Sequence, residues 1–166
     1  MKLLVLRHDV AEAREAGAGP DADAKRALTG EGRKRAARAG RAVARLIGDL
    51  DLLATSPLRR ARETAEALAR ELDDVELTET DALAPGHSPA ELAGWLSQQE
   101  GIEQAAIVGH EPGLSEFVTW LVSGLSTPWL ELGKGGACLI ELPDRIAPGQ
   151  GRLLWLLRPG QLRKLG

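Results

Sequence analysis

The sequence contains a single cysteine, Cys138, no tyrosine, one phenylalanine and four tryptophans. One cysteine cannot form a disulfide within the chain, which fits a reducing compartment. Because aromatic side chains are scarce, leucine, alanine and valine must build the core, and 43% of the residues are hydrophobic. Three histidines and one cysteine without ligand spacing make a metal site improbable, and we expect neither a metal nor another cofactor.

Long apolar runs are also missing. The run at the N-terminus is four residues long, too short for a signal peptide, and no stretch approaches the ~20 apolar residues of a membrane span. The net charge of −3 argues against a dedicated nucleic-acid binder. We therefore expect a soluble cytoplasmic protein without a membrane or nucleic-acid partner, formed by one domain over residues 1–166.

Strand and helix patterns alternate along the chain. Short apolar runs predict strands at 2–6, 52–55, 75–78, 105–108, 137–142 and 153–157. Helical spacing of apolar residues predicts helices at 30–48, from 57, at 88–99 and from 112. Thr29 and Ser56 are predicted N-caps, and residues 9–28 are expected to form a loop. This order predicts an α/β fold: three α/β/α layers, with a mainly parallel central sheet and helices on both faces.

Charged side chains follow three of these strands. Arg7 and His8 end the first, Arg60 follows the second, and His110 follows the fourth. In open α/β sheets, ligands bind beyond the carboxyl ends of the strands. Arginine guanidinium groups pair with phosphate oxygens, and a neutral imidazole can attack phosphorus. Residues Arg7, His8, Arg60 and His110 are therefore predicted to surround a phosphoryl group.

Four motifs in order resemble those of the histidine phosphatase (phosphoglycerate-mutase-like) superfamily. Residues 6–8 (LRH) resemble its Arg-His-Gly signature, and 56–64 (SPLRRARET) its S-P-x-x-R-A-x-x-T. Residues 108–112 (VGHEP) resemble V-G-H-x-P. Residues 23–32 are similar to the D-x-x-R-x-L-T-x-x-G segment of the SixA-type phosphohistidine phosphatase branch. The resemblance covers residues 3 to about 142.

The resemblance implies a role for each matched residue. His8 would be the phosphorylated nucleophile, and Arg7, Arg60 and His110 would bind the phosphoryl oxygens. Arg59 and Arg62 do not match the family position and are expected to be flanking charges.

Asp9 departs from the family, which usually has Gly or Ala there. A carboxylate beside a phosphate pocket would repel the substrate unless it turns away or pairs with an arginine. Alternatively, Asp9 orients a ring or a water.

The general acid of the ester-cleaving relatives also has no counterpart. Where the resemblance places it, the sequence reads Leu83-Ala84-Pro85. A general acid contributes about 10²–10⁴-fold, whereas an imidazole leaving group needs less help. This favours a phosphohistidine protein as substrate. Other possible proton donors are each expected to be structural, with His87 the best substitute: Glu79, Asp81, His87 and Glu111.

Two alternatives stay open: a phosphatase of small phosphorylated metabolites, and a non-catalytic phosphate-binding module. The sequence does not fix the oligomeric state. Lys134, in a glycine-rich segment, lacks a phosphate-loop motif and is expected to lead into a strand. A basic stripe is expected to be solvated surface; it consists of Lys34, Arg38, Arg41 and Arg45.

Overall fold

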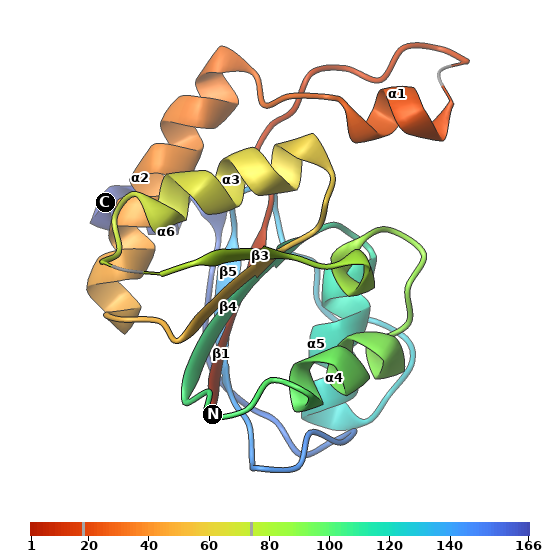
Figure 1. The fold of residues 1–166 in the computed structure, drawn as a ribbon, viewed down its shortest axis with the longest axis vertical. Coiled ribbons are helices and arrows are strands. Elements are labelled where there is room, and N and C mark those ends of the chain that lie inside the picture. Colours follow the sequence, from red (N-terminus) through yellow and green to blue (C-terminus); the bar gives the residue numbers. More distant parts are fainter. Residues whose placement is uncertain (18, 74) are drawn as a thin grey trace.

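The computed structural model describes residues 1–17, 19–73 and 75–166. Six strands form one sheet in the order β3-β2-β4-β1-β5-β6 (Figure 1). The strands are β1 (Lys2–Arg7), β2 (Leu52–Thr55), β3 (Leu77–Glu79), β4 (Gln104–Gly109), β5 (Ala137–Glu141) and β6 (Arg152–Leu157). Strands β1 to β4 run parallel, and β5 is antiparallel to both β1 and β6. The predicted mainly parallel α/β sheet is confirmed.

Helices cover both faces of the sheet (Figure 1). Alternate residues of β1 point to opposite sides: Leu4 and Leu6 pack with the helices of one face, and Leu3 and Val5 with those of the other. The first face is covered by α2 (Gly30–Ile47), α3 (Arg59–Ala69) and α6 (Pro159–Leu165), and the second by α4 (Pro89–Ser97) and α5 (Gly113–Ser123). The predicted three layers are therefore present.

Some local predictions were wrong. The segment 9–28 contains a short helix, α1 (Pro20–Ala24), in which no residue is buried, so it has no apolar periodicity to detect. Helix α6 was not predicted, because Leu162 is the only buried residue in it. Ser56 does not cap α3, which begins at Arg59 with Leu58 in the N-cap position.

Cys138 lies in β5 within the core and has no exposed surface. Burial raises the pKa of its thiol to about 12. Among the described residues, no helix is both long and apolar enough to cross a membrane, and in the same part of the chain no group of His, Cys, Asp and Glu has the geometry of a metal site.

Candidate active site

The two histidines lie side by side at the carboxyl ends of adjacent strands. β1 and β4 are paired so that Arg7 lies opposite Gly109, and His8 and His110 are the next residues of each chain segment. The amide of His8 donates to the Gly109 carbonyl (3.1 Å). Their ring centroids are 4.9 Å apart, at an interplanar angle of 55°. The strand register thus brings together two residues that are 102 positions apart.

His8 is held in one tautomer by the backbone. Its Nδ1 lies 2.7 Å from the carbonyl oxygen of Asp9, and because a carbonyl only accepts, Nδ1 carries the proton. Nε2 therefore keeps a free electron pair. Burial is the main cause that lowers the pKa of His8 to about 4, and the positive charges of Arg60 and Arg7 add to it. The ring is neutral at pH 7, as a nucleophile requires.

His110 is fixed by Ser56, which follows β2. Nε2 of His110 and Oγ of Ser56 are 2.8 Å apart, and Nδ1 of His110 is buried with no hydrogen-bond partner among the described residues. Burial lowers the pKa of His110 to about 3, helped by His8 and Arg60. The contact explains why Ser56 is not a helix cap: its side chain faces the site. The S-P-x-x-R motif was the signal that could have assigned it there.

Arg7 and Arg60 place two guanidinium groups near the histidines, and their positive charges add to the effect of burial in lowering the pKa of each ring. Arg7 donates from Nη1 to the carbonyl of Leu132 (2.5 Å). Arg60 is 5% exposed and donates to the backbone carbonyl (2.9 Å) and the carboxylate (3.1 Å) of Asp23. The Nε atoms of both arginines are buried without a hydrogen-bond partner in the described structure. Each guanidinium group therefore has one N–H without a partner in the described part of the chain.

Asp23 is a further site residue, on the short helix α1. Although burial acts to raise its pKa, the charges of Arg60 and Arg26 hold that pKa below its usual range. Asp23 is therefore ionised at neutral pH and orients the Arg60 guanidinium. The sequence motif contained Asp23, but reading the segment as a loop gave no reason to place it against Arg60.

Asp9 turns its carboxylate into the protein. Oδ1 accepts a hydrogen bond from the Val10 amide (2.7 Å), while Oδ2 packs against Gly135. The side chain has no exposed surface, and burial raises its pKa. The backbone amide of Asp9 donates to Thr64 Oγ1 (3.2 Å), and its carbonyl orients His8. Asp9 thus orients the ring through its backbone, and its carboxylate stays out of solvent.

Lys134 also lies near the site. It belongs to a turn that leads into β5, as expected, and its charge contributes, after burial and the two arginines, to the lowered pKa of His8. The Gly135 amide donates to the carbonyls of Arg7 and His8 (3.1 and 3.2 Å). The turn is thereby attached to the end of β1, a long-range contact that local sequence does not reveal.

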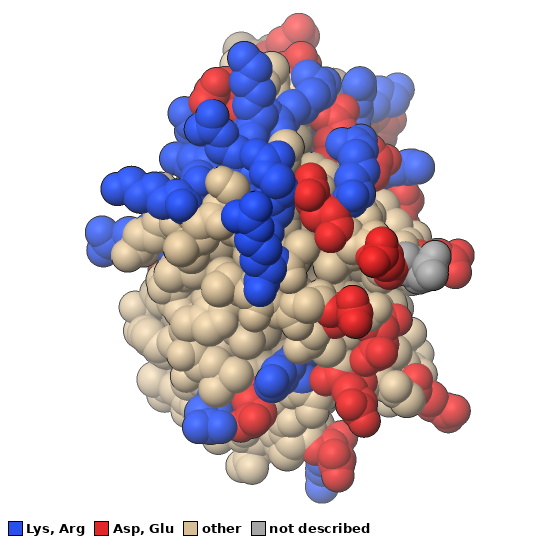
Figure 2. Space-filling model, turned by 90° about the vertical axis from the view of Figure 1, so that its left-hand side faces the viewer, with Lys and Arg blue, Asp and Glu red and all other residues tan. Residues whose placement is uncertain are grey.

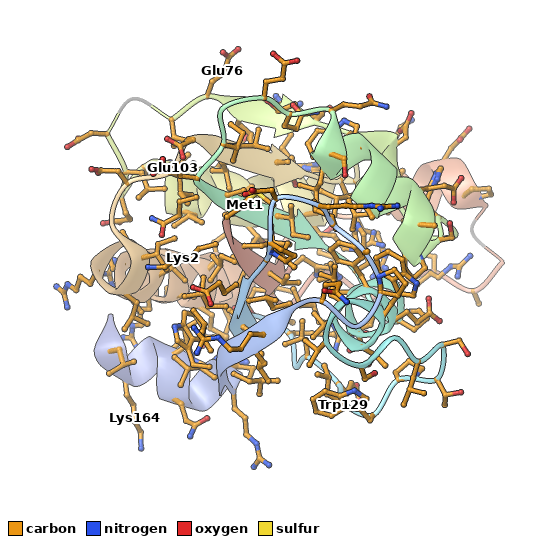
Figure 3. The ribbon with its side chains drawn as sticks, turned by 90° about the horizontal axis from the view of Figure 1, so that it is seen from below. Met1, Lys2, Glu76, Glu103, Trp129 and Lys164 are labelled. Atoms are coloured by element: carbon orange, nitrogen blue, oxygen red, sulfur yellow. The ribbon has the colours of Figure 1, made fainter. Side chains whose placement is uncertain are left out.

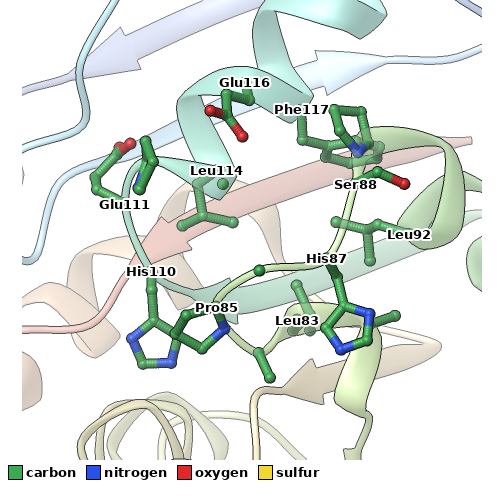
Figure 4. Close-up of a pocket in the computed structure, with 16 residues that line it drawn as sticks. Leu83, Pro85, His87, Ser88, Leu92, His110, Glu111, Leu114, Glu116 and Phe117 are labelled. Atoms are coloured by element: carbon green, nitrogen blue, oxygen red, sulfur yellow. The ribbon is translucent and has the colours of Figure 1, made fainter.

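A cavity of about 510 Å³ opens beside His110, between α5 and the segment that follows β3 (Figure 4). Its walls are mainly apolar and include Leu83, Pro85, Leu92, Leu114 and Phe117. Pro85, at the position where the resemblance places a general acid, lies next to His110 in the view of Figure 4.

The candidate proton donors are mostly engaged elsewhere. Glu111 accepts from the amide and hydroxyl of Ser115 and from the Leu132 amide, and burial raises its pKa. Glu79 pairs with Arg62 (3.0 Å). The remaining two are Asp81, in the 3-10 turn η1 (Asp81–Leu83), and His87, which lines the cavity and lies 3.6 Å from Glu91.

The chain is similar to known proteins in sequence and in fold. Residues 3–85 match the family model of the histidine phosphatase superfamily (branch 1). The chain belongs to this superfamily. Its members are phosphatases, so the chain is a phosphatase with a histidine mechanism. An uncharacterized protein from Picosynechococcus sp. is 33% identical over 138 residues, 82% of each chain.

Solved structures show the same fold at lower identity. The protein histidine phosphatase SixA complexed with tungstate is similar with a TM-score of 0.82 and 21% identity, over 98% of this chain and 99% of that one. The alpha-ribazole phosphatase from Shigella flexneri gives 0.74 and 17%, over 96% and 97%. Phosphoserine phosphatase from Entamoeba histolytica gives 0.68 and 18%, over 97% and 98%. Relatives with this fold thus carry names for different substrates.

Proposed function

We propose that this phosphatase removes the phosphoryl group from phosphohistidine on a protein. The observation that carries the proposal is Pro85, which lines the cavity beside His110 where the resemblance places a general acid. An alkoxide leaving group needs a proton from such an acid, whereas an imidazole whose other nitrogen carries a proton leaves as a neutral ring. The resemblance to SixA-type enzymes points to the same substrate.

In the first step, the electron pair on Nε2 of His8 attacks phosphorus. A P–N bond forms to His8 while the P–N bond to the substrate imidazole breaks. The Nδ1–H of His8 stays on the Asp9 carbonyl, which stabilises the positive ring that develops. The low pKa of His8 keeps Nε2 unprotonated before the attack.

The charge of the phosphoryl oxygens is stabilised by three groups with unused hydrogen-bonding atoms. These are Nε of Arg7, Nε of Arg60 and Nδ1 of His110. A phosphoryl group here offers oxygens to the arginines, and the neutral tautomer of His110 with its proton on Nδ1, in which Nε2 accepts from the Ser56 hydroxyl, makes that ring a further donor. In the second step, water attacks phosphorus, the P–N bond to His8 breaks with its electron pair returning to Nε2, and inorganic phosphate leaves with both protons of the water.

The proposal is tested with four substrates: a histidine-phosphorylated protein, free phosphohistidine, p-nitrophenyl phosphate and a sugar phosphate. We expect release of phosphate from both phosphohistidine substrates and little from the sugar phosphate. His8→Ala should abolish turnover and the acid-labile phosphoenzyme, while the control His87→Ala retains both. Rapid release from the sugar phosphate with none from phosphohistidine would overturn the proposed substrate. Unchanged turnover in His8→Ala would overturn the mechanism.

A second candidate is hydrolysis of small phosphate monoesters. It is favoured by the apolar cavity of about 510 Å³ next to His110, which is large enough for a small leaving group, and by His87 in its wall. In that case His87→Gln would lower kcat for the sugar phosphate, as expected when a general acid is lost. With phosphohistidine as substrate, His87→Gln should leave kcat unchanged.

A further inference from the structure

Charge is unevenly distributed between the elements of this phosphatase. The segments 30–48 and 158–166 hold nine of the 21 Lys and Arg residues but only one of the 24 Asp and Glu residues. The rest of the chain is strongly acidic. Figure 2 shows the result, with basic side chains gathered over the upper part of one side of the molecule. One region of the surface is therefore strongly positive, although the net charge of the chain is −3.

Helices α2 and α6 pack together to form this surface. Arg45 donates to the carbonyl of Leu165 (3.1 Å), and Gly166 lies against the backbone of Arg38. We define the basic face as Lys34, Arg38, Arg41, Arg45, Arg158, Arg163 and Lys164. The stripe expected from the sequence on α2 thus continues onto α6, two segments far apart in the chain.

The basic face is not neutralised by neighbouring carboxylates. The basic residues of α2 that do form ion pairs are Arg33, with Glu63, and Arg35, with Glu31. Within the described residues, none of the seven residues of the basic face is within 4.0 Å of a carboxylate oxygen. Figure 3 shows Lys164 extending away from the molecule. Unpaired exposed cations attract an anionic partner over about one Debye length.

The basic face is connected to the end of β1 through the turn that precedes β5. This turn packs against the start of α6, because a Cβ on Gly133 would lie 2.9 Å from Pro159. The Gly135 amide of the same turn donates to the carbonyls of Arg7 and His8 (3.1 and 3.2 Å). A partner that contacts the α6 end of the basic face would therefore lie next to the turn that is bonded to His8.

The opposite end of the sheet is acidic. A hollow there, where the parallel strands begin, is lined by Asp49, Asp51, Glu103, Glu141 and Asp144, together with Met1 and Lys2. Figure 3 views the molecule from this end, with Met1, Lys2 and Glu103 labelled. An acidic partner is repelled from this end and attracted to the basic face, so the charge distribution orients its approach.

We propose that the basic face binds an acidic surface of the protein that presents the phosphohistidine. This inference rests on the proposed function and adds the chemistry of the partner. A specific interface covers about 800 Å² on each partner, so the contact should extend well beyond the residues that surround the phosphohistidine. The acidic remainder of this chain would repel a long duplex polyanion, so a compact acidic protein fits better than a nucleic acid.

The test reverses three exposed charges of the basic face, Lys34→Glu, Arg38→Glu and Lys164→Glu, in one variant. The control reverses three exposed charges elsewhere, Lys2→Glu, Arg70→Glu and Arg145→Glu, so that both variants have the same net charge. The substrates are free phosphohistidine and an acidic phosphotransfer domain phosphorylated on one surface histidine.

At low ionic strength, we expect the basic-face variant to lose about 10- to 100-fold in kcat/KM for the phosphorylated domain. The loss should shrink as salt is added. Its kcat/KM for free phosphohistidine should stay unchanged, and the control variant should change neither value. An equal loss on both substrates, or an equal loss in the control, would overturn the docking role.

Binding separates this inference from the proposed function. In a His8→Ala background, which leaves the basic face intact, the acidic domain should bind, and the three reversals should weaken binding about 10-fold or more. This result can be obtained even if the wild-type chain hydrolyses no phosphohistidine, an outcome that would overturn only the proposed function. The inference would be overturned if the acidic domain bound equally well with and without the three reversals. It would also be overturned if the reversals weakened binding to duplex DNA but not to the acidic domain.

Discussion

Asp23 accepts two hydrogen bonds from Arg60, one at its backbone carbonyl (2.9 Å) and one at its carboxylate (3.1 Å). Two acceptors fix the plane of the guanidinium group, which a single contact does not. Because Asp23 lies in α1, this short helix determines how Arg60 is presented to the two histidines. The pair makes an otherwise exposed element part of the candidate site.

Replacing Asp23 with Asn should therefore impair catalysis more than stability. The variant keeps the backbone acceptor but loses a charged one, and hydrogen bonds to charged groups contribute about 1.5–3 kcal/mol. We expect kcat/KM to fall by about 10-fold or more, measured with the best substrate of the panel. Asp21→Asn, on the exposed side of the same helix, is the matched control. Equal effects of the two variants would contradict a positioning role for Asp23.

Arg60→Lys should be strongly defective, although the charge is kept. Lysine cannot supply the planar set of donors that Arg60 divides between Asp23 and a phosphoryl group. We expect a loss of at least about 100-fold in kcat/KM and weaker inhibition by inorganic phosphate. Arg59→Lys changes the preceding residue, which is exposed and pairs with Glu63 (2.8 Å). That control should retain wild-type kinetics, and a comparable loss there would refute the assignment of Arg60.

Stability should fall on acidification because His8 and His110 are buried as neutral rings. Burial lowers the pKa of His8 to about 4 and that of His110 to about 3, whereas an unfolded histidine titrates near 6.5. Between these values the unfolded chain binds protons that the native chain does not. The free energy of unfolding should therefore drop by ~2 kcal/mol per ring from pH 6.5 to pH 5.

Urea titrations of wild type and His8→Asn at these two pH values measure this effect. The variant should lose ~2 kcal/mol less than wild type on acidification. Its control is His87→Asn, since the His87 side chain is 37% exposed. The buried carboxyl groups of Asp9 and Glu111, whose pKa values are raised by burial, act with the opposite sign but are common to all three proteins. An unchanged pH dependence in His8→Asn would exclude the buried neutral ring.

Gly135→Ala should destabilise the protein through Asp9. Gly135 has a φ of +74°, and an added Cβ would lie 2.3 Å from Oδ2 of Asp9. Backbone strain alone costs of order 1–3 kcal/mol, and the steric conflict adds to it. Gly101→Ala, at φ +70° with no neighbour within 4 Å, measures the strain by itself. Equilibrium unfolding should show a larger loss for Gly135→Ala, and the difference should vanish in an Asp9→Gly background. If it persists, Asp9 is not the obstacle.

The sequence was sufficient to predict the mainly parallel sheet and to expect His8 and His110 at the same edge of it. Strands such as β1 and β4 are short apolar runs, buried on both sides, and a histidine follows each of them directly. Because parallel strands place their carboxyl ends together, His8 and His110 could be expected to meet. The structure places their rings 4.9 Å apart.

Contacts between distant segments of the chain were not predictable in this way. The attachment of Gly135 to the end of β1 and the contact of Ser56 with His110 depend on loop conformations without a periodic pattern. Likewise, α6 has a single buried residue, Leu162, so its pairing with α2 follows only from the tertiary structure. The sequence therefore predicted only the part of the basic face that lies on α2, and the part on α6 was found in the structure.

The reactivity of Cys138 can be used to measure local unfolding of the sheet. As the only cysteine, it lies in β5 without exposed surface, and burial raises its pKa to about 12. The thiolate is the reactive form, so thiol reagents and peroxides should leave the native enzyme active. Covalent labelling of Cys138 requires β5 to separate from the elements packed against it. The labelling rate therefore measures how often β5 becomes exposed to solvent.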